Sequence, residues 1–375
     1  MITRILSKVV IDGCKDGFIT VIYGPRRVGK TVLLEQIKAA LPYPDILTFN
    51  GDTQETRDLL STTSETKLSS IVKNQKIIFI DEAQRIKNIG LSLKILIDQF
   101  PDLKIIVTGS ATLDLSKGVR ETLTGRTITY RLFPLSMREI VPNDEQNRSQ
   151  YLLPDVLLFG GYPYVQSLAN PIDKQRYLEE LAADYLLKDL LELKDVGDPD
   201  ALRKLLSLLA YQIGNQVSLN ELASQVSIST KTVARYLWLL EKVFVIFPLG
   251  TYSTNLRSEV ARSKKYYFYD LGIRNALIRQ FGTLDSRTDV GALWENFMMV
   301  ERMKKHEYDR NPTSMFFWRD YAQNEIDLIE KNEQNITAFE FKWSARKRSK
   351  TPKFFKDAYA IHSQTIHPEN FETFI

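Results

Sequence analysis

Residues 18–41 read FITVIYGPRRVGKTVLLEQIKAAL, and this stretch decides the fold of the front of the chain. Residues 18–23 are a short apolar run rich in β-branched side chains, which predicts a buried parallel strand. Residues 24–31, GPRRVGKT, fit the pattern G-x-x-x-x-G-K-[ST] at every fixed position. Residues 32–41 then place apolar side chains at helical spacing. Strand, glycine-rich loop and helix in this order predict a phosphate-binding P-loop in an α/β fold.

The residue types of this loop fit a nucleotide and its Mg²⁺ ion. Gly24 and Gly29 let the backbone curl, so that amide N–H groups converge on phosphate oxygens. The following helix presents its positive end to the same anion. Lys30 is expected to reach the β- and γ-phosphates, and Thr31 to offer its hydroxyl to Mg²⁺. The predicted nucleotide-binding residues of the loop are Gly24, Pro25, Arg26, Arg27, Val28, Gly29, Lys30 and Thr31.

Two later apolar runs end in polar residues that suit the same site. The run IIFI is followed by Asp81 and Glu82. We expect its strand to lie beside the P-loop strand, so that Asp81 contributes to the Mg²⁺ shell. Glu82 would then polarise an attacking water as a general base. The run LKIIVTGSA ends in Thr108 and Ser110, either of which could face the γ-phosphate, and a helix N-cap is the alternative role for Ser110.

Arg126 is a further candidate for contact with the nucleotide. It ends the segment LTGR, just before another strand-like run. An arginine finger could act there on a nucleotide bound by the same chain or by a neighbouring subunit. The alternative is a plain surface arginine.

These segments resemble the AAA-like P-loop ATPases, and more narrowly a bacterial and archaeal family with one consistent layout. That family has the motifs GPRxVGKT, FIDEAQ, TGS at a strand end, LxGR, PLS and GGYP in this order. The matching segments of this chain are residues 24–31, 79–84, 108–110, 123–126, 134–136 and 160–163. The resemblance extends over nearly the whole chain, and it implies an ATPase that uses ATP and Mg²⁺. It also implies a C-terminal region related to restriction-type nucleases.

The middle of the chain predicts a helix-turn-helix. Residues 143–148 are polar and suggest a linker, and residues 177–193 have helical periodicity, as a lid or connector would. Ser218 with Glu221 forms a capping-box start for a helix that ends near Val226. A second helix to about Val243, followed by a strand from VFVIF, completes the outline of a winged helix.

The second helix of that motif carries the candidate contacts to DNA. In a winged helix-turn-helix its N-terminal residues enter the major groove. The predicted nucleic-acid contacts there are Lys231, Thr232 and Arg235. The alternative is that the motif contacts protein within the ATPase.

The C-terminal region has the residue order of a PD-(D/E)xK nuclease, as the resemblance implies. Glu295 lies early in a predicted helix, Asp327 in a strand, and the strand TAFEFKW at residues 337–343 carries Glu340 and Lys342. Carboxylates that converge from a helix and two strands can bind Mg²⁺. Lys342 would orient a water or stabilise charge on the scissile phosphate. The ordinary alternative for Glu340 and Lys342 is a solvated ion pair on an exposed strand face.

A basic run follows directly after this strand. Residues 339–356 hold seven Lys and Arg and a single acid, Glu340. We expect this run to hold a nucleic-acid backbone. The candidate contacts within it are Arg346, Lys347 and Arg348. The PD-(D/E)xK motif departs from its usual form, because Glu325 and Ile326 stand where a proline usually precedes Asp327.

Composition limits the compartment and the class of site. Cys14 is the single cysteine of 375 residues, so neither an intramolecular disulfide nor a cysteine-based zinc site is expected. No apolar run approaches the roughly 18 residues that a membrane span needs. The three histidines show no metal-site spacing. These features predict a cytoplasmic protein with no membrane segment.

The sequence therefore predicts an α/β protein with four regions and two possible uses. Residues 1–142 form the P-loop ATPase domain, 143–200 a helical connector, 201–255 the winged helix and 256–375 the nuclease-like domain. The chain would couple ATP hydrolysis to DNA binding or processing, with Mg²⁺-dependent nuclease activity as a further possibility. The alternative is an ATP-driven switch that binds DNA or protein around an inactive nuclease-like scaffold. A homo-oligomer or a partner protein is possible in both.

Overall fold

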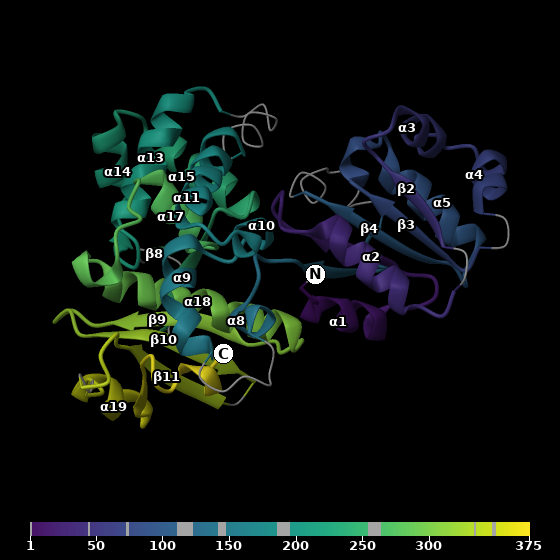
Figure 1. Ribbon diagram of the computed structural model, residues 1–375. Coiled ribbons are helices and arrows are strands. Elements are labelled where there is room, and N and C mark those ends of the chain that lie inside the picture. Colours follow the sequence, from purple (N-terminus) through teal and green to yellow (C-terminus); the bar gives the residue numbers. More distant parts are fainter. Residues whose placement is uncertain are drawn as a thin grey trace. The chain divides into compact units, whose positions relative to one another are not determined.

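The computed structural model describes most of the chain, in two compact units (Figure 1). The units are Met1–Phe133 and Pro134–Ile375. The connector, winged-helix and nuclease-like regions expected from the sequence all fall within the second unit, so the boundaries between them stay predictions. The described residues are 2–43, 46–72, 75–110, 123–141, 148–185, 196–253, 264–333, 335–346 and 350–375.

The first unit alternates strands and helices, as the sequence predicts. Its described elements are α1 (Ile5–Gly13), β1 (Ile19–Tyr23), α2 (Lys30–Ala40), β2 (Leu47–Asn50), α3 (Gln54–Leu60), α4 (Glu65–Val72), β3 (Ile77–Asp81), η1 (Ala83–Arg85), α5 (Ile89–Gln99), β4 (Lys104–Gly109) and β5 (Thr127–Arg131). Helix α2 packs against β3 and β4, and α1 packs against α2 (Figure 1).

Its described strands form one parallel sheet in the order β2-β3-β4-β1-β5. Strands β1 and β3 are buried along their whole length, which explains their unbroken runs of apolar residues. The expectation that the strand of Asp81 lies directly beside the P-loop strand is wrong, because β4 lies between them. Thr108 on β4 is therefore placed between the P-loop and Asp81.

The second unit begins with helices and ends with a sheet. Its described elements are α8 (Met137–Ile140), α9 (Arg148–Phe159), α10 (Pro163–Ser167), α11 (Pro171–Glu180), the π-helical turn η2 (Leu181–Tyr185), α13 (Pro199–Tyr211), β6 (Gln216–Val217), α14 (Leu219–Val226), α15 (Thr230–Lys242), β7 (Ile246–Thr251), β8 (Lys264–Phe268), α17 (Leu271–Leu277), η3 (Leu284–Ser286), α18 (Val290–Tyr308), β9 (Ser314–Arg319), β10 (Glu325–Asn332), β11 (Asn335–Phe341), α19 (Lys353–Tyr359), β12 (Ser363–Ile366) and η4 (Phe371–Thr373).

The helix-turn-helix lies where the sequence places it. The side chain of Ser218 accepts a hydrogen bond from the backbone of Glu221 and begins α14, and Ser229 does the same for α15. The following strand starts later than expected, at Ile246, because a turn with a φ of 60° at Phe244 precedes it. Of the helix expected over 177–193, the structure shows the end of α11 and then η2, and residues 186–195 lie outside the described residues.

The described strands of the second unit form a mixed sheet in the order β12-β11-β10-β9-β7-β8-β6. Strands β7 and β9 are parallel, as are β11 and β12, and the other pairs are antiparallel. Helix α18 packs against β8 and β11, and Figure 1 shows it beside the arrows of β9 and β10.

A bulge interrupts the pairing of β10 with β9 around Asp327. The register of β10 with β9 shifts between Ile326 and Ile329. Both isoleucines lie in one buried cluster, with Trp318 and Phe355, although they are three residues apart. Side chains therefore do not alternate strictly between the two faces of the sheet at Asp327 and Leu328. Bulges of this kind redirect side chains and are common next to active sites.

Candidate functional site

The P-loop backbone has the curled conformation that its glycines predict. Gly29, just before α2, has a φ of 93°, a left-handed value that glycine adopts without strain. A side chain at Gly24 would place Cβ 2.5 Å from the carbonyl oxygen of Leu132, so only glycine fits there. The loop joins the end of β1 to the start of α2, where backbone amides and a helix N-terminus favour an anion. Of the other loop residues, Pro25 and Val28 are buried, Arg26 is half-buried and Arg27 is exposed.

Arg4 supports the loop from within the first unit, a role that sequence reasoning missed. Its side chain is buried, with 3% exposed. The guanidinium donates to the carbonyl oxygen of Val28 at 2.9 Å and to that of Phe133 at 2.6 Å. A buried guanidinium is costly unless its donors are used. These contacts therefore fix the loop to the chain that follows β5.

Lys30 and Thr31, the first residues of α2, connect the loop to the acidic end of β3. The Nζ of Lys30 donates to two carbonyl oxygens of the loop at 3.2 Å each. It lies 3.8 Å from Oε1 of Glu82. The hydroxyl of Thr31 donates to Oδ2 of Asp81 at 2.7 Å. The structure thus brings together the cationic, hydroxyl and acidic groups that the sequence singles out separately.

Asp81, Glu82 and Thr108 meet where β3 and β4 end. The hydroxyl of Thr108 donates to Oδ1 of Asp81, and its oxygen accepts from the backbone N–H of Glu82 at 3.2 Å. Glu82 has a φ of 51°, which is rare for a residue other than glycine. Such conformations persist where the surrounding structure enforces them, often at functional sites. Thr108 thus orders both acids.

Gln84 is a second residue whose role sequence reasoning missed. Its amide nitrogen donates to Oε2 of Glu82, and its amide oxygen accepts from the backbone N–H of Ser110 at 3.3 Å. Gln84 therefore bridges the ends of β3 and β4 and orients the Glu82 carboxylate. Its place in the segment FIDEAQ is the signal that could have found it. The N-cap alternative for Ser110 concerns residues 111–122, which lie outside the described residues.

Arg126 and the P-loop lie at opposite ends of the strands of the sheet. Its carbonyl oxygen accepts from the N–H of Ile19, the first residue of β1, whereas the loop follows the last residue of that strand. At about 3.3 Å per residue this separates it from the loop by roughly 15 Å. Its guanidinium pairs with Asp98. This geometry argues against contact with a nucleotide in the same chain, and action on a neighbouring subunit stays a prediction.

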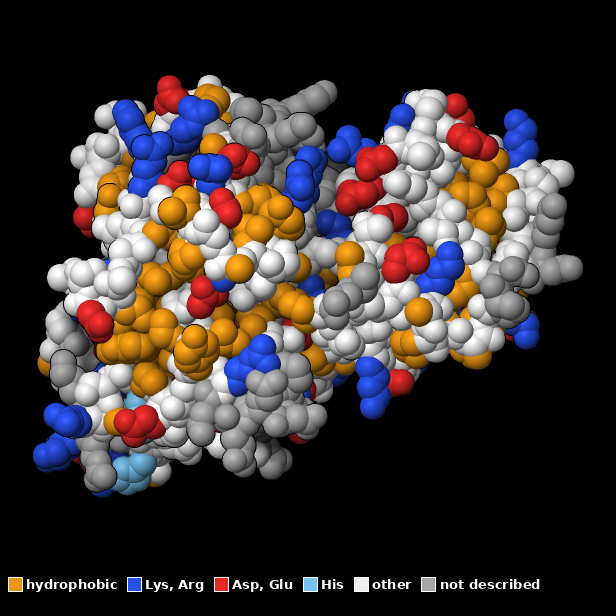
Figure 2. Space-filling view, viewed as in Figure 1, with side chains coloured by type: hydrophobic (Ala, Val, Ile, Leu, Met, Phe, Trp, Pro, Cys, Tyr) orange, Lys and Arg blue, Asp and Glu red, His pale blue; other side chains and the backbone are white. Residues whose placement is uncertain are grey.

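Basic and aromatic side chains share one exposed face of α15. Lys231, Arg235 and Trp238 are spaced four and three residues apart, which places them on the same side of a helix. Trp238 is 44% exposed, unusual for so large an apolar ring, and Nζ of Lys242 lies 5.8 Å from its centroid. Figure 2 shows Lys and Arg side chains gathered over α13 to α15. The exposed tryptophan was not among the predicted contacts.

Thr232 is committed to the helix start rather than to this exposed face. Its backbone N–H donates to the hydroxyl oxygen of Ser229 at 3.1 Å, and the two hydroxyl oxygens lie 2.8 Å apart. Of the three contacts predicted on this helix, Lys231 and Arg235 are therefore the more accessible.

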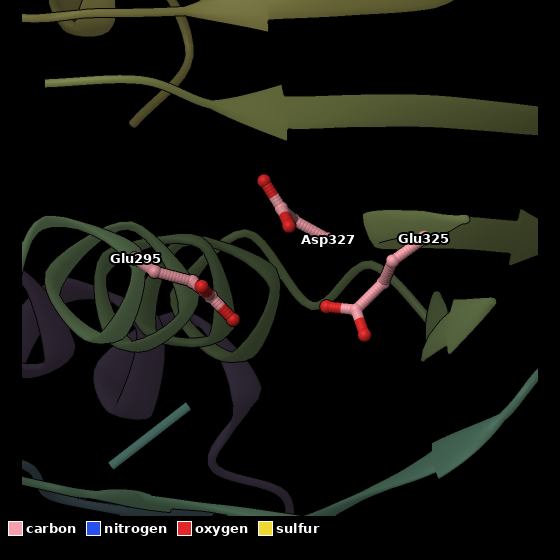
Figure 3. Close-up of side chains that lie close together, drawn as sticks. All are labelled: Glu295, Glu325 and Asp327. Atoms are coloured by element: carbon pink, nitrogen blue, oxygen red, sulfur yellow. The ribbon is translucent and has the colours of Figure 1, made fainter. Parts of the chain in front are cut away.

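Three carboxylates of the second unit converge into what we call the acidic cluster: Glu295 on α18, and Glu325 and Asp327 on β10. One oxygen atom of each lies within 4.8 Å of the others. Figure 3 shows the three side chains pointing toward one another. The predicted metal set had Glu340 in place of Glu325. Glu325 was read only as the residue where a proline was missing, which hid its role.

A lysine from a distant strand contacts the acidic cluster. Lys265 on β8 is 2% exposed. Its Nζ lies 3.1 Å from Oε1 of Glu295 and also pairs with Glu325. The hydroxyl of buried Tyr267 donates to the same Oε1 at 2.6 Å. Burial raises the pKa of Glu295 to about 7, and Lys265 partly offsets that rise.

Buried Glu340 and half-buried Lys342 form an ion pair beside the cluster. Glu340 is 3% exposed, so the interpretation of this strand as a solvated ion-pair face is wrong. The Nζ of Lys342 lies 2.9 Å from Oε2 of Glu340 and 3.5 Å from Oδ2 of Asp327. The same Oδ2 accepts from the backbone N–H of Phe341 at 2.7 Å. Burial and the nearby Asp327 charge raise the pKa of Glu340 to about 7.

The basic run beyond β11 is described only in part. Arg346 and Lys350 are exposed. Lys347 and Arg348 lie outside the described residues. A nucleic-acid contact through this run stays a prediction.

Family models match three successive parts of the chain. Residues 16–141 match a model described as an AAA domain. Residues 150–284 match a domain of unknown function (DUF8612), and residues 290–370 match another (DUF4143). The N-terminal part is therefore of the AAA-type P-loop ATPase class. The models for the later parts name no activity.

Similar proteins occur in distant organisms. An uncharacterized protein of Mycobacterium tuberculosis is 26% identical over 337 residues, which cover 89% of this chain and 71% of that protein. One of Haemophilus influenzae is 27% identical over 313 residues, with 77% and 75% covered. One of Methanocaldococcus jannaschii is 24% identical over 336 residues, with 85% and 74% covered. Each is described as uncharacterized, so none supplies a function.

The comparison with solved structures adds no functional information. A chain from the structure described as "Structural Basis for DNA Unwinding at Forked dsDNA by two coordinating Pif1 helicases" has a TM-score of 0.25 and 13% identity, and the match covers 48% of this chain and 52% of that one. A likeness at this TM-score carries no argument. Among the described residues, no helix combines the length and the apolarity that crossing a bilayer requires.

Proposed function

We propose that this chain binds ATP with Mg²⁺, hydrolyses the ATP, and uses the cycle to control DNA binding or processing by the second unit. The observation that carries the ATPase part is the convergence of Lys30, Thr31, Asp81 and Glu82 at one end of a parallel sheet. Their chemistry is that of phosphoryl transfer to water, in which positioning and electrostatic stabilisation do most of the work. The AAA-domain match over residues 16–141 supports the same assignment.

The residues divide the task by their positions. Lys30, which now bonds to loop carbonyls, is placed to move onto the β- and γ-phosphates. The Thr31 hydroxyl and the Asp81 carboxylate are adjacent oxygen donors of the kind that Mg²⁺ prefers. Mg²⁺, when bound with ATP, neutralises charge on the β- and γ-phosphates. Glu82, oriented by Gln84, is the group that polarises the attacking water.

A nucleotide titration tests the phosphate site. In Lys30→Ala we expect ATP affinity to fall by at least about tenfold, because a charge-assisted contact is worth about 1.5–3 kcal/mol. Lys38→Ala is the matched control, since Lys38 lies two turns further along α2 and away from the loop. Unchanged ATP affinity in Lys30→Ala, measured with a fluorescent nucleotide, would show that the loop does not bind phosphate.

The DNA part of the proposal is supported by α15. A cationic face with an exposed indole suits a nucleic acid, because lysine and arginine pair with phosphates and an aromatic ring stacks on an unpaired base. Lys231 and Trp238 supply these two contacts in our proposal. The helix-turn-helix connectivity of α14 and α15 supports duplex contact through the same face.

The second candidate is an ATP-driven switch whose C-terminal region is a scaffold and does not cut DNA. The three carboxylates of the acidic cluster have the oxygen donors that Mg²⁺ requires. A buried ammonium, that of Lys265, already contacts two of them. The three carboxylates thus have the chemistry to bind a divalent cation, but two of them are already paired with Lys265. This observation favours the scaffold over a resident metal nuclease.

A further inference from the structure

Lys265 contacts the acidic cluster from a strand that holds it in place. Its strand, β8, is paired on both sides, with Leu249 of β7 opposite Lys265 on one side and Gln216 of β6 on the other. Its Nζ lies 5.4 Å from the centroid of the Phe317 ring. With 2% of the residue exposed, the ammonium is shielded from solvent. Lys265 is therefore a fixed part of the cluster.

The cluster and its surroundings are close to balanced in charge. Glu295 and Glu325 both contact Lys265, and Arg319 lies 3.8 Å from Oε2 of Glu325. Asp327 is paired with Lys342. Each carboxylate thus already has a cationic partner. A divalent cation would have to break at least one of these pairs before it could bind.

We propose that Lys265 is the resident cation of the acidic cluster, and that its ammonium keeps a divalent cation out of it. The inference deepens the scaffold alternative of the proposed function and rests on it for its biological meaning. A buried ammonium whose carboxylate partners are taken by a metal is strongly destabilised. We expect that penalty to weaken divalent binding by at least about 100-fold, which corresponds to about 2.7 kcal/mol.

Two further features of the site agree with this assignment. The Nζ of Lys265 pairs with two carboxylates at once, those of Glu295 and Glu325, which favour its ammonium form. The hydroxyl of Tyr267 occupies another lone pair of Glu295. Oε1 of Glu295 is thereby shared between two donors and is less available to a metal.

The experiment is a Mn²⁺ titration of the nucleotide-free full chain, followed by electron paramagnetic resonance of the free ion. The variants are wild type, Lys265→Met, Asp327→Asn, and Lys265→Met combined with Asp327→Asn. Lys264→Met is the matched control, because Lys264 is the exposed neighbour on the same strand. All variants share the same P-loop, so differences between them report on the acidic cluster. Thermal unfolding with and without Mn²⁺ gives a second readout.

The expected result is a gain of metal binding on removal of the lysine. Wild type and Lys264→Met should show no cluster site tighter than about 1 mM, whereas Lys265→Met should gain one site at least about 100-fold tighter. Adding Asp327→Asn should remove the gain. Mn²⁺ should raise the melting temperature of Lys265→Met but not that of wild type.

Two results would overturn the inference. One is a stoichiometric micromolar Mn²⁺ site in wild type that Asp327→Asn abolishes. This test does not use Lys265→Met, so it remains decisive even if that variant does not fold. The other is a folded Lys265→Met, or Lys265→Gln as the less apolar replacement, that gains no site. No ATP or DNA is present in the titration. A failure here is thus separate from a failure of the ATPase or of DNA binding.

Discussion

Glu82→Gln is the substitution that tests the proposed hydrolysis step most directly. The glutamine keeps the size of the side chain and its backbone conformation, and it can still hydrogen-bond to Gln84. It removes the charge that would polarise water. The phosphate contacts come from the loop and Lys30, and Glu82 makes none of them in our proposal. Nucleotide affinity should therefore change by no more than about twofold, less than about 0.4 kcal/mol.

The expected loss of rate follows from the role assigned to Glu82. A positioned general base contributes about 10²–10⁴-fold to a rate. At 1.36 kcal/mol for each factor of ten, this raises the barrier by about 3–5 kcal/mol. The Nζ of Lys30, 3.8 Å from Oε1 of Glu82, also loses a counter-charge. Because that pair can be replaced by the phosphates once ATP is bound, we expect the loss to appear in kcat and not in KM.

The assay is steady-state phosphate release at saturating ATP, with nucleotide affinity measured in parallel. Gln84→Glu is unsuitable as a control because Gln84 contacts the Glu82 carboxylate. Glu35→Gln is the better match, because it neutralises an exposed carboxylate on α2. Hydrolysis by Glu82→Gln at the wild-type rate would refute the general-base assignment. A parallel loss of ATP affinity would instead indicate that Glu82 organises the loop.

The remaining predictions concern the second unit. Trp238→Ala should weaken binding to forked or single-stranded DNA by about 1–3 kcal/mol, with a smaller effect on duplex DNA, because base stacking is lost. Lys231→Ala should weaken both to a similar degree and reduce the salt slope of binding by about one; equal losses for both variants on every DNA would argue against stacking. Wild type should show only background Mg²⁺-dependent DNA cleavage, and Asp327→Ala should show the same level. Cleavage by wild type that Asp327→Ala abolishes would instead support the nuclease interpretation.

The P-loop could be predicted in detail because its signal is local. Strand, loop and helix are consecutive in sequence, and the left-handed conformation of Gly29 and the contacts of Lys30 with loop carbonyls lie within that segment. The position of β4 could not be predicted in the same way. Strand order depends on pairing between segments far apart in sequence, and no residue pattern in β3 records which neighbour it will have.

The acidic cluster was predicted only in part, for a similar reason. The helix that carries Glu295 and the strand that carries Asp327 were both expected from periodicity. Alternation, however, could not indicate the bulge between Ile326 and Ile329, on either side of Asp327. Lys265 lies 30 residues before Glu295, in an aromatic strand that reads as ordinary core. Its role depends on sheet order and therefore appears only in the structure.

The motif segments PLS and GGYP find a structural explanation in the second unit. A side chain at Gly160 would place Cβ 2.1 Å from Oδ1 of Asp270, and the N–H of Gly161 donates to Oδ2 of the same residue at 2.7 Å. Leu135 N–H donates to the carbonyl oxygen of Gly161, also at 2.7 Å. These residues hold the start of the second unit against its own core. They require no catalytic role.

Hydrogen bonds within each unit also anchor the chain on either side of the boundary between Phe133 and Pro134. In the first unit, Arg4 ties the P-loop carbonyl of Val28 to that of Phe133, the last residue before the second unit begins. In the second, the carbonyl oxygen of Leu135 accepts from Nζ of Lys304 at 3.0 Å, on the helix α18 that also carries the first carboxylate of the acidic cluster. Each of these hydrogen bonds lies within its own unit, so each unit anchors its own end of the segment.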